Sequence, residues 1–227
     1  MPMQMNNAAT PRAVVFDLDG LMFNTEELYQ DVGGELCRRR GKAFDAELVD
    51  AMMGRPGRVA FQIMIDWHGF TDTVTALADE SELIFAEILD TRLALMPGAA
   101  ELLASLERAG IPKAIATSSG LRFVTDVLSR FDLKPRFQFI LTAEDVTEGK
   151  PHPEIYLKAA ALFGIEPTEM LVLEDSQNGC RAAAAAGAIA VAVPGGHSLR
   201  HDFSGASLVA SSLADPGIYA LLGIEQA

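Results

Sequence analysis

The stretch Val14-Val15-Phe16-Asp17-Leu18-Asp19-Gly20 decides the fold of this chain of 227 residues. Its first three residues are all apolar and do not alternate with polar ones as in a half-buried strand. Such an uninterrupted run is typical of a strand covered on both faces. The run ends in two aspartates, and charge at the end of a buried strand is costly unless something binds it. Carboxylate oxygens are preferred ligands of Mg²⁺, and we therefore expect a magnesium site at this strand end.

Two later apolar runs also end in polar side chains. Residues 114–116 are followed by Thr117-Ser118-Ser119, and residues 170–173 are followed by Glu174-Asp175-Ser176. Ligands of open α/β sheets bind outside the carboxyl ends of the strands, so these residues and the first acid pair should meet at one edge. The lysine of Gly149-Lys150-Pro151 lies between the two later runs. Acid pairs, a hydroxyl and a lysine are together the parts of a metal-assisted phosphoryl-transfer site.

From about residue 96 onward, short apolar runs alternate with helical patterns. This alternation predicts βαβ units and therefore an α/β fold with a doubly wound parallel sheet. Gly110, Gly164 and Gly187 lie where helices are expected to end before the next strand. The expected strands are residues 114–116, 137–141, 170–173 and 189–193, with an edge strand at 207–210, and the expected helices are 122–130, 153–163 and 178–186.

The segment between the first strand and residue 96 has a different pattern, with no convincing strand. Leu28, Val32 and Leu36 repeat at helical spacing, and Gly54-Arg55-Pro56-Gly57 interrupts the pattern. We therefore predict a small helical lobe that is inserted after the first strand and joined to the core by a two-stranded hinge. The predicted division is a core of residues 11–25 and 96–227 and a lobe of residues 26–95.

Composition and charge exclude several classes of partner. The net charge of −13 argues against nucleic acid and anionic membranes, because both attract basic surfaces. No apolar run approaches the about 20 residues of a membrane helix. Residues 1–10 are polar and lack basic side chains, so we expect a frayed tail and no secretory signal. Cys37 and Cys180 fit no metal spacing, which predicts reduced thiols in a cytoplasmic protein.

Phosphoryl transfer assigns separate tasks to the acids. Asp17 would attack a phosphate that is itself an anion, and at ~4 Å like charges repel by several kcal/mol at an intermediate dielectric. Mg²⁺ between Asp17 and a phosphate oxygen would remove that repulsion. Asp175 would be a second carboxylate ligand of the metal. Glu174 would either ligate the metal or orient the loop, and the sequence leaves both roles open.

The remaining polar residues would bind the phosphate and move protons. Lys150 would neutralise developing charge and hold Asp17 ionised, and Thr117 would donate its hydroxyl to a phosphate oxygen. We expect Ser118 and Ser119 to open a helix, so that their amides and the helix dipole favour an anion there. Asp19 would protonate the leaving alkoxide and later take a proton from the attacking water.

The chain resembles the haloacid dehalogenase superfamily of phosphohydrolases. The matching segments are Asp17-Leu18-Asp19-Gly20, Ala116-Thr117-Ser118-Ser119, Gly149-Lys150-Pro151 and Glu174-Asp175-Ser176, in an order and spacing that match across nearly the whole chain. The resemblance implies a Rossmann-like core, an inserted helical cap, and an aspartyl-phosphate intermediate formed on Asp17. It also implies Asp19 as the general acid and base, and Mg²⁺ held by the Asp17 side chain, the Asp19 main-chain oxygen and Asp175.

Three further segments are similar to the pseudouridine-5′-phosphatase and sugar-phosphate phosphatase group. They are Leu21-Met22-Phe23-Asn24-Thr25-Glu26, Met96-Pro97-Gly98-Ala99 and Asn178-Gly179, with the departure that Asn24 stands where this group often has aspartate. We therefore expect a Mg²⁺-dependent phosphomonoester hydrolase whose partner is a small phosphorylated metabolite, a sugar or nucleoside phosphate. We expect no nucleic-acid or membrane partner, and a monomer or weak dimer.

Two other activities use similar parts. A β-phosphoglucomutase has the same core but a cap histidine a few residues after the position of Thr25-Glu26, where this chain has Tyr29, which favours hydrolysis. A signalling receiver domain also phosphorylates an aspartate beside Mg²⁺, a hydroxyl and a lysine. Its phosphoacceptor lies later in the fold and it has no inserted cap, so this reading is disfavoured.

Substrate choice should depend on the lobe. Arg55 and Arg58 flank its central turn and are candidates for reaching the substrate, and a solvated role for both stays open. Glu26, at the hinge, would contact a substrate hydroxyl or cap a helix. We expect Trp67 in the core of the lobe and His68 on its surface.

Overall fold

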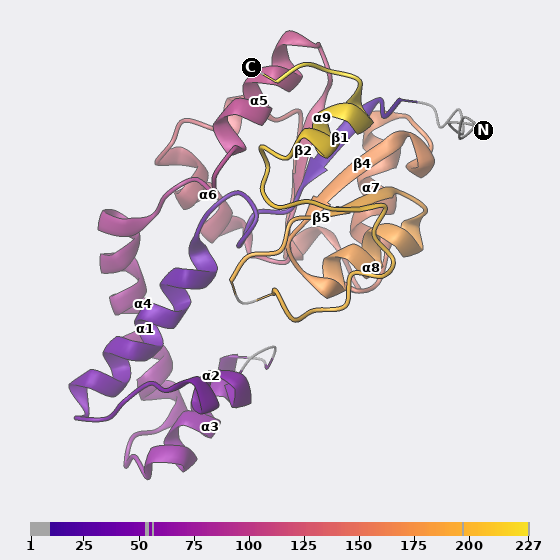
Figure 1. The fold of residues 1–227 in the computed structure, drawn as a ribbon. Helices are drawn as coiled ribbons and strands as arrows, with labels where there is room; N and C mark the ends of the chain where they lie inside the picture. The colour runs from indigo at the N-terminus through magenta and orange to yellow at the C-terminus, as the bar shows by residue number, and fades with distance from the viewer. Residues whose placement is uncertain (1–9, 53–54, 56, 197, 227) are drawn as a thin grey trace. The chain divides into compact units, whose positions relative to one another are not determined.

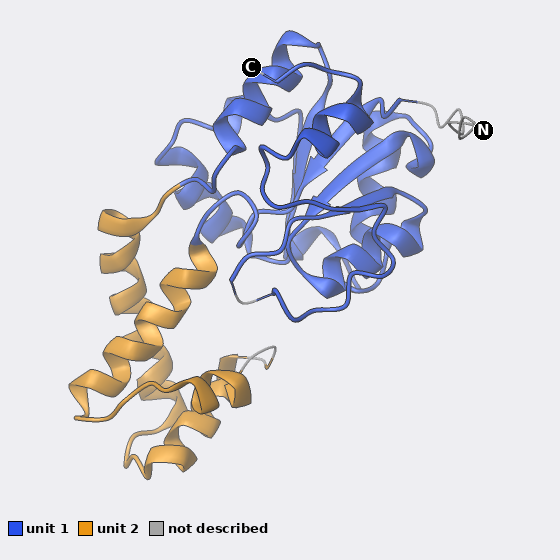
Figure 2. Cartoon of the chain, viewed as in Figure 1, with its two compact units in different colours: residues 1–24, 95–227 blue, residues 25–94 orange. Residues whose placement is uncertain are grey.

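The computed structural model describes residues 10–52, 55, 57–196 and 198–226. Most of the predicted N-terminal tail, and Gly54 and Pro56 of the predicted turn, therefore lie outside the described residues. The chain divides into two compact units, residues Met1–Asn24 with Leu95–Ala227, and residues Thr25–Ala94 (Figure 2). The lobe expected at residues 26–95 and the second unit cover nearly the same segment.

The first unit is built on a six-stranded sheet with the strand order β3-β2-β1-β4-β5-β6, and neighbouring strands of this sheet are parallel (Figure 1). Chain order reverses on the two sides of β1, which is where ligands bind in such sheets. The doubly wound parallel sheet predicted from the sequence is thereby confirmed. The strands are β1 (Ala13–Phe16), β2 (Lys113–Ala116), β3 (Ile140–Leu141), β4 (Met170–Glu174), β5 (Ile189–Ala192) and β6 (Leu208–Val209).

The strands are apolar on both faces because helices cover both sides of the sheet. Tyr156, Ala182 and Ala183 pack against Val15 and Val172, and the small side chains of α8 bring that helix close to the strands. Two helices, α5 and α9, were not identified from the sequence. The helices of this unit are α5 (Ala99–Arg108), α6 (Leu121–Ser129), α7 (Glu154–Phe163), α8 (Gln177–Ala186) and α9 (Pro216–Leu222), with 3-10 turns η1 (Lys134–Arg136), η2 (Ala143–Asp145) and η3 (Pro167–Glu169).

One predicted strand is much shorter than expected. The apolar run at residues 137–141 forms a strand only at Ile140–Leu141. Phe137 belongs to the turn that follows η1, and its amide donates to the Lys134 carbonyl. The next two residues already form backbone hydrogen bonds with β2, because the Gln138 amide donates to the Lys113 carbonyl and the Ile115 amide donates to the Phe139 carbonyl. The run therefore lies along β2, although only its last two residues are a regular strand.

The second unit contains four helices within its described residues and no strand: α1 (Thr25–Arg39), α2 (Ala46–Met52), α3 (Gly57–His68) and α4 (Val74–Arg92). Leu36, Leu48, Met64 and Leu77 bring all four helices into one apolar cluster. Gly33 lies against the ring of Phe44, and the absence of a side chain makes this close packing possible. A Cβ at position 33 would come within 2.5 Å of that ring. None of the helices in the described part of the chain is both long and apolar enough to cross a bilayer.

The expectations for Trp67 and His68 are wrong. Trp67 is 48% exposed, whereas His68 is half-buried and stacks on Phe70 with ring centroids 5.2 Å apart. In α3 the buried positions are Met64 and Ile65, and a helical stripe through them continues to residue 68 and misses residue 67. Helical spacing therefore decides which side chain is covered, and residue size does not.

Candidate functional site

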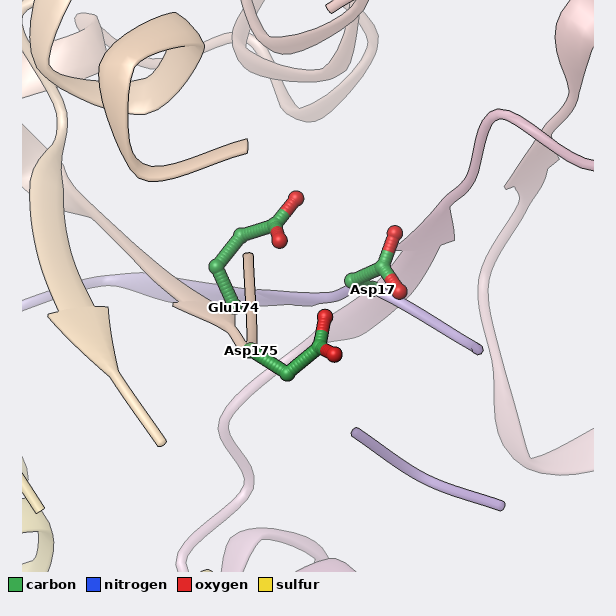
Figure 3. A group of neighbouring side chains, drawn as sticks. All are labelled: Asp17, Glu174 and Asp175. Atoms are coloured by element: carbon green, nitrogen blue, oxygen red, sulfur yellow. The ribbon is translucent and has the colours of Figure 1, made fainter. Parts of the chain in front are cut away.

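The sheet delivers four polar residues to one edge. Asp17 follows β1, Thr117 follows β2, Glu174 ends β4 and Asp175 follows it. The register pairs Phe16 with Leu173, and the amide of Asp17 donates to the Leu173 carbonyl at 3.0 Å. The first acid of the chain is thereby fixed beside the acid pair from residues 174 and 175. Figure 3 shows these three carboxylates around a common point.

Lys150 comes from the loop between β3 and α7 and reaches the same point. Its ammonium donates to Asp17 Oδ1 at 2.6 Å, to Glu174 Oε1 at 2.6 Å and to the Ala116 carbonyl at 2.9 Å. An ammonium has three protons, so its donor capacity is filled within the protein. Burial alone would lower the pKa of Lys150, but the carboxylates of Asp17 and Glu174 raise it well above its usual range. The lysine is a permanent positive charge against Asp17.

Asp17 is buried among like charges. Its pKa lies well above the usual range because burial raises it, and the carboxylates of Glu174 and Asp175 raise it further against the opposing ammonium of Lys150. The ammonium of Lys150 forms ion pairs with two of these buried carboxylates, those of Asp17 and Glu174. A cation bound there would favour the ionised form of Asp17.

The donor set fits a divalent hard cation. Ligand oxygens of Asp17, Glu174 and Asp175 lie within 4.8 Å of one another, and all three residues are buried. Carboxylate oxygens are the ligands of Mg²⁺ and Ca²⁺, whereas the softer metals prefer nitrogen or sulfur. Neither thiol belongs to this cluster of metal-binding side chains. The cluster therefore suits the magnesium predicted from the sequence.

The two neighbouring acids of β4 have different surroundings. Glu174 is fully buried, and its Oε1 accepts hydrogen bonds from Lys150 and from the hydroxyl of Tyr156, the latter at 2.5 Å. Its Oε2 accepts from the hydroxyl of Ser176 at 3.0 Å. Both oxygens of Glu174 are thus engaged by the protein. Of the two roles left open for this residue, the geometry favours the orienting one.

Sequence reasoning missed Tyr156, and it identified Gly179 only as part of the Asn178-Gly179 match, without its role beside Glu174. Tyr156 lies on the buried face of α7, where its spacing indicates only packing. Gly179 lies in α8, and a Cβ there would come within 1.9 Å of the Glu174 carboxyl group. The contact of each residue with Glu174 has no local signal in the sequence, because it depends on how α7 and α8 pack against β4.

The second acid of the first motif is held by hydroxyls. Asp19 Oδ2 accepts a hydrogen bond from Ser119 Oγ at 2.6 Å and a longer one from Thr117 Oγ1 at 3.3 Å. The amide of Ser119 donates to Thr117 Oγ1 at 3.0 Å. The segment after β2 therefore orients the carboxyl group of Asp19. The hydroxyl of Ser119 was not among the predicted site residues.

The prediction that Ser118 and Ser119 begin a helix is wrong. Helix α6 begins at Leu121, with Gly120 as its N-cap. The carboxylate of Glu144 accepts from the Leu121 amide, at 3.2 and 3.1 Å from its two oxygens, so an anion already occupies that helix end. Among the described hydrogen bonds, the amide of Ser118 donates to no acceptor. This segment therefore presents the loop amide of Ser118, whereas the helix N-terminus is already bound by Glu144.

The remaining predicted site residues belong to the helical unit. Arg55 and Arg58 are exposed, and their part in substrate binding stays a prediction, as does that of Glu26. The ring of Tyr29 stacks on Phe85 with centroids 4.5 Å apart and planes 7° apart. Tyr29 thus has a packing partner within its own unit.

Comparison with known proteins supports the motif assignment. The model of the haloacid dehalogenase-like hydrolase family matches residues 14–193. An Arabidopsis thaliana protein named (DL)-glycerol-3-phosphatase 1, mitochondrial, is 35% identical over 80% of this chain, which spans 63% of that relative. A Drosophila melanogaster protein named "Probable pseudouridine-5′-phosphatase" is 34% identical over 88% of this chain and 89% of its own length.

A solved structure shows the same architecture. It is described as a HAD family hydrolase of Deinococcus radiodurans with bound phosphate and sodium, and it covers 96% of this chain and 100% of its own. Its TM-score is 0.83 at 28% sequence identity. The resemblance drawn from the four motifs is confirmed, and this chain belongs to the haloacid dehalogenase-like hydrolase family.

Proposed function

We propose that this protein is a Mg²⁺-dependent phosphomonoesterase that moves the phosphoryl group of a small metabolite, a sugar or nucleoside phosphate, first to Asp17 and then to water. One observation carries the proposal. A buried carboxylate, that of Asp17, lies 2.6 Å from a buried ammonium, that of Lys150, in a cluster of three buried carboxylates. Such a cluster suits a site whose ligands are a divalent cation and a phosphate.

The chain's own residues supply the metal ligands. The side chains of Asp17 and Asp175, with the main-chain oxygen of Asp19, would hold the ion. When bound, Mg²⁺ offsets the repulsion between the phosphate and Asp17. Glu174 would stay in its place beside Lys150, because its oxygens already accept hydrogen bonds from the protein.

In the first half of the reaction, an oxygen of Asp17 attacks phosphorus. A bond forms between the carboxylate oxygen and phosphorus, and the bond between phosphorus and the leaving oxygen breaks. Asp19, protonated, gives its proton to that leaving oxygen, so that an alcohol departs. The hydroxyls of Ser119 and Thr117 hold Asp19 in place for this transfer. The amide of Ser118 is available to a phosphate oxygen.

In the second half, water attacks the acyl phosphate. Asp19, now ionised, takes a proton from the water, and the Asp17 carboxylate departs with the electrons of its bond to phosphorus. Inorganic phosphate is released, and both carboxyl groups return to their initial states. Lys150 opposes the negative charge of Asp17 throughout and does not need to move a proton.

The names of the relatives support the substrate class. One is named as a phosphatase of glycerol 3-phosphate and another as a phosphatase of pseudouridine 5′-phosphate, both small phosphate monoesters. The mutase alternative predicts phosphoryl transfer between sugar positions, and Tyr29 in place of a cap histidine argues against it. A receiver domain would consume one phosphoryl group and stop, whereas a phosphatase releases phosphate many times.

A phosphate-release screen with Mg²⁺ tests the proposal. The panel includes pseudouridine 5′-phosphate, glycerol 3-phosphate, hexose phosphates and glucose 1-phosphate, and Asp17→Asn is the matched control because it keeps the size of the side chain. We expect multiple turnovers on at least one ester and none by Asp17→Asn. Equal release by both proteins would refute Asp17 as the nucleophile. Glucose 6-phosphate formed from glucose 1-phosphate would instead indicate a mutase.

A further inference from the structure

Tyr156 is the largest fully buried side chain of the core and carries a hydroxyl that packing does not need. Its ring lies in the apolar cluster with Val172, Ala182 and Ala183. A phenylalanine would fill this place without the cost of desolvating a hydroxyl, which is about 1–3 kcal/mol when no partner is present. The hydroxyl has a partner, Glu174 Oε1, at 2.5 Å.

The oxygen bound by Tyr156 is the same oxygen that binds Lys150. Glu174 Oε1 accepts from Tyr156 on one side and from the Lys150 ammonium at 2.6 Å on the other. The same ammonium lies 2.6 Å from Asp17 and 5.2 Å from the centre of the Tyr156 ring. A short series of contacts thus joins a hydroxyl on α7 to the carboxylate that follows β1.

Hydrogen bonds of this kind fix position. A hydrogen bond to a charged group contributes about 1.5–3 kcal/mol, and here both ends are desolvated. Without the hydroxyl, Glu174 Oε1 would keep only Lys150 of its two donors among the described residues, and the carboxylate could turn about its side-chain torsions. The lysine would then lose one of the three acceptors that set its distance from Asp17.

We infer that Tyr156 is a positioning residue of this enzyme: its hydroxyl fixes Glu174, and Glu174 holds the Lys150 ammonium against Asp17. The inference rests on the proposed function, because it concerns the alignment of Asp17 for attack. Tyr156 touches neither substrate nor metal in this scheme. Its loss should therefore lower kcat, whereas the affinity for substrate should change little.

The test compares Tyr156→Phe with Tyr219→Phe. Tyr219 lies in α9, is likewise buried, and the charged groups that act on it are Glu101 and Arg108 of α5, so its variant removes a buried hydroxyl outside the acid cluster. The probes are 4-nitrophenyl phosphate and the best substrate of the metabolite screen, both with Mg²⁺. We expect kcat about tenfold lower for Tyr156→Phe with KM within about twofold, and both constants near wild type for Tyr219→Phe.

The outcomes separate the two claims. A wild-type protein that releases no phosphate from any ester refutes the proposed function. An active wild type with an equally active Tyr156→Phe variant overturns the inference alone, as does a loss carried only by KM. If Tyr156→Phe does not fold, Gly179→Ala tests the same step from the other side of the carboxylate, because its Cβ would displace Glu174. A fall in its kcat at constant KM supports the inference, and unchanged kcat overturns it.

Discussion

Replacing Gly179 by alanine should destabilise the protein, although alanine is the better helix former. Gly179 lies in the first turns of α8 and is buried against Glu174. A Cβ at this position would lie 1.9 Å from Glu174 Oε1 and 2.0 Å from Oε2, whereas real Cβ contacts are not shorter than 3.0 Å. Either the carboxylate or the helix must move by about 1 Å, the difference between these distances.

The size of the effect follows from two opposing contributions. In a helix interior, alanine is more favourable than glycine by about 1 kcal/mol. A displaced Glu174 would lose its hydrogen bonds with Lys150 and Tyr156, and disrupting a buried ion pair costs about 3–5 kcal/mol. The net loss in the free energy of unfolding is therefore about 2–4 kcal/mol. For a chain of this size, that corresponds to a fall in Tm of roughly 5–15 °C.

Thermal unfolding followed by circular dichroism measures this effect, with Gly34→Ala as the control. Gly34 also lies inside a helix, α1, but a Cβ there would meet no atom within 4 Å. Its variant should be more stable than wild type by about 0.5–1 kcal/mol, as propensity alone predicts. If Gly179→Ala melts at or above the wild-type temperature and keeps its kcat, Glu174 is not held in a fixed place and the reasoning is refuted.

Three further outcomes are expected. Asp19→Asn should slow the hydrolysis of sugar phosphates far more than that of 4-nitrophenyl phosphate, whose leaving group needs no proton; equal slowing would refute the acid role. EDTA should abolish phosphate release and Mg²⁺ should restore it, and full activity in the chelator would remove the metal from the scheme. Hydrogen bonds from Arg136 and then Lys113 lower the pKa of Glu107 to about 2. Because the pKa of Glu107 is lower in the folded protein, its ionised form stabilises the fold. This stabilisation is complete above the pKa of an unfolded glutamate, about 4.3, and is lost as the pH falls toward 2. The side chain is 41% exposed, so Glu107→Gln should cost about 1 kcal/mol at pH 7 in urea unfolding and less at pH 3; a constant difference would contradict this.

The parts of the fold and site that could be predicted are those with a local signal. The runs before Asp17, Thr117 and Glu174 are apolar on both faces, and the topology of parallel strands brings their ends together. Tyr156 and Ser119 could not be predicted in their roles, because each acts on an acid from a different segment. A tyrosine on a buried helix face has the same local pattern whether or not its hydroxyl is used.

The predicted start of the helix after β2 is wrong for a related reason. A strand followed by small hydroxyl residues is typical of an anion-binding helix end, which is what Ser118 and Ser119 indicate. Whether that end is vacant depends on a residue elsewhere in the chain, and here Glu144 binds the first amide of α6. The local sequence indicates which amides could bind an anion, but only the tertiary structure shows whether another side chain, here Glu144, already accepts from them.

The adjacent acids Glu174 and Asp175 illustrate how one motif can hold two functions. Successive side chains of a strand project to opposite faces, so neighbouring residues cannot both point to the same place unless the strand ends between them. Figure 3 shows the two side chains leaving the chain in different directions. Glu174 is the last residue of β4 and turns toward Lys150 and Tyr156, whereas Asp175 lies beyond the strand. Removing Asp175 should therefore weaken the binding of Mg²⁺, whereas Glu174→Gln should leave Mg²⁺ affinity largely intact and lower kcat by releasing Lys150. Titration of activity with Mg²⁺ separates the two effects, and a Glu174→Gln variant whose kcat recovers fully at high Mg²⁺ would show that Glu174 is a metal ligand after all.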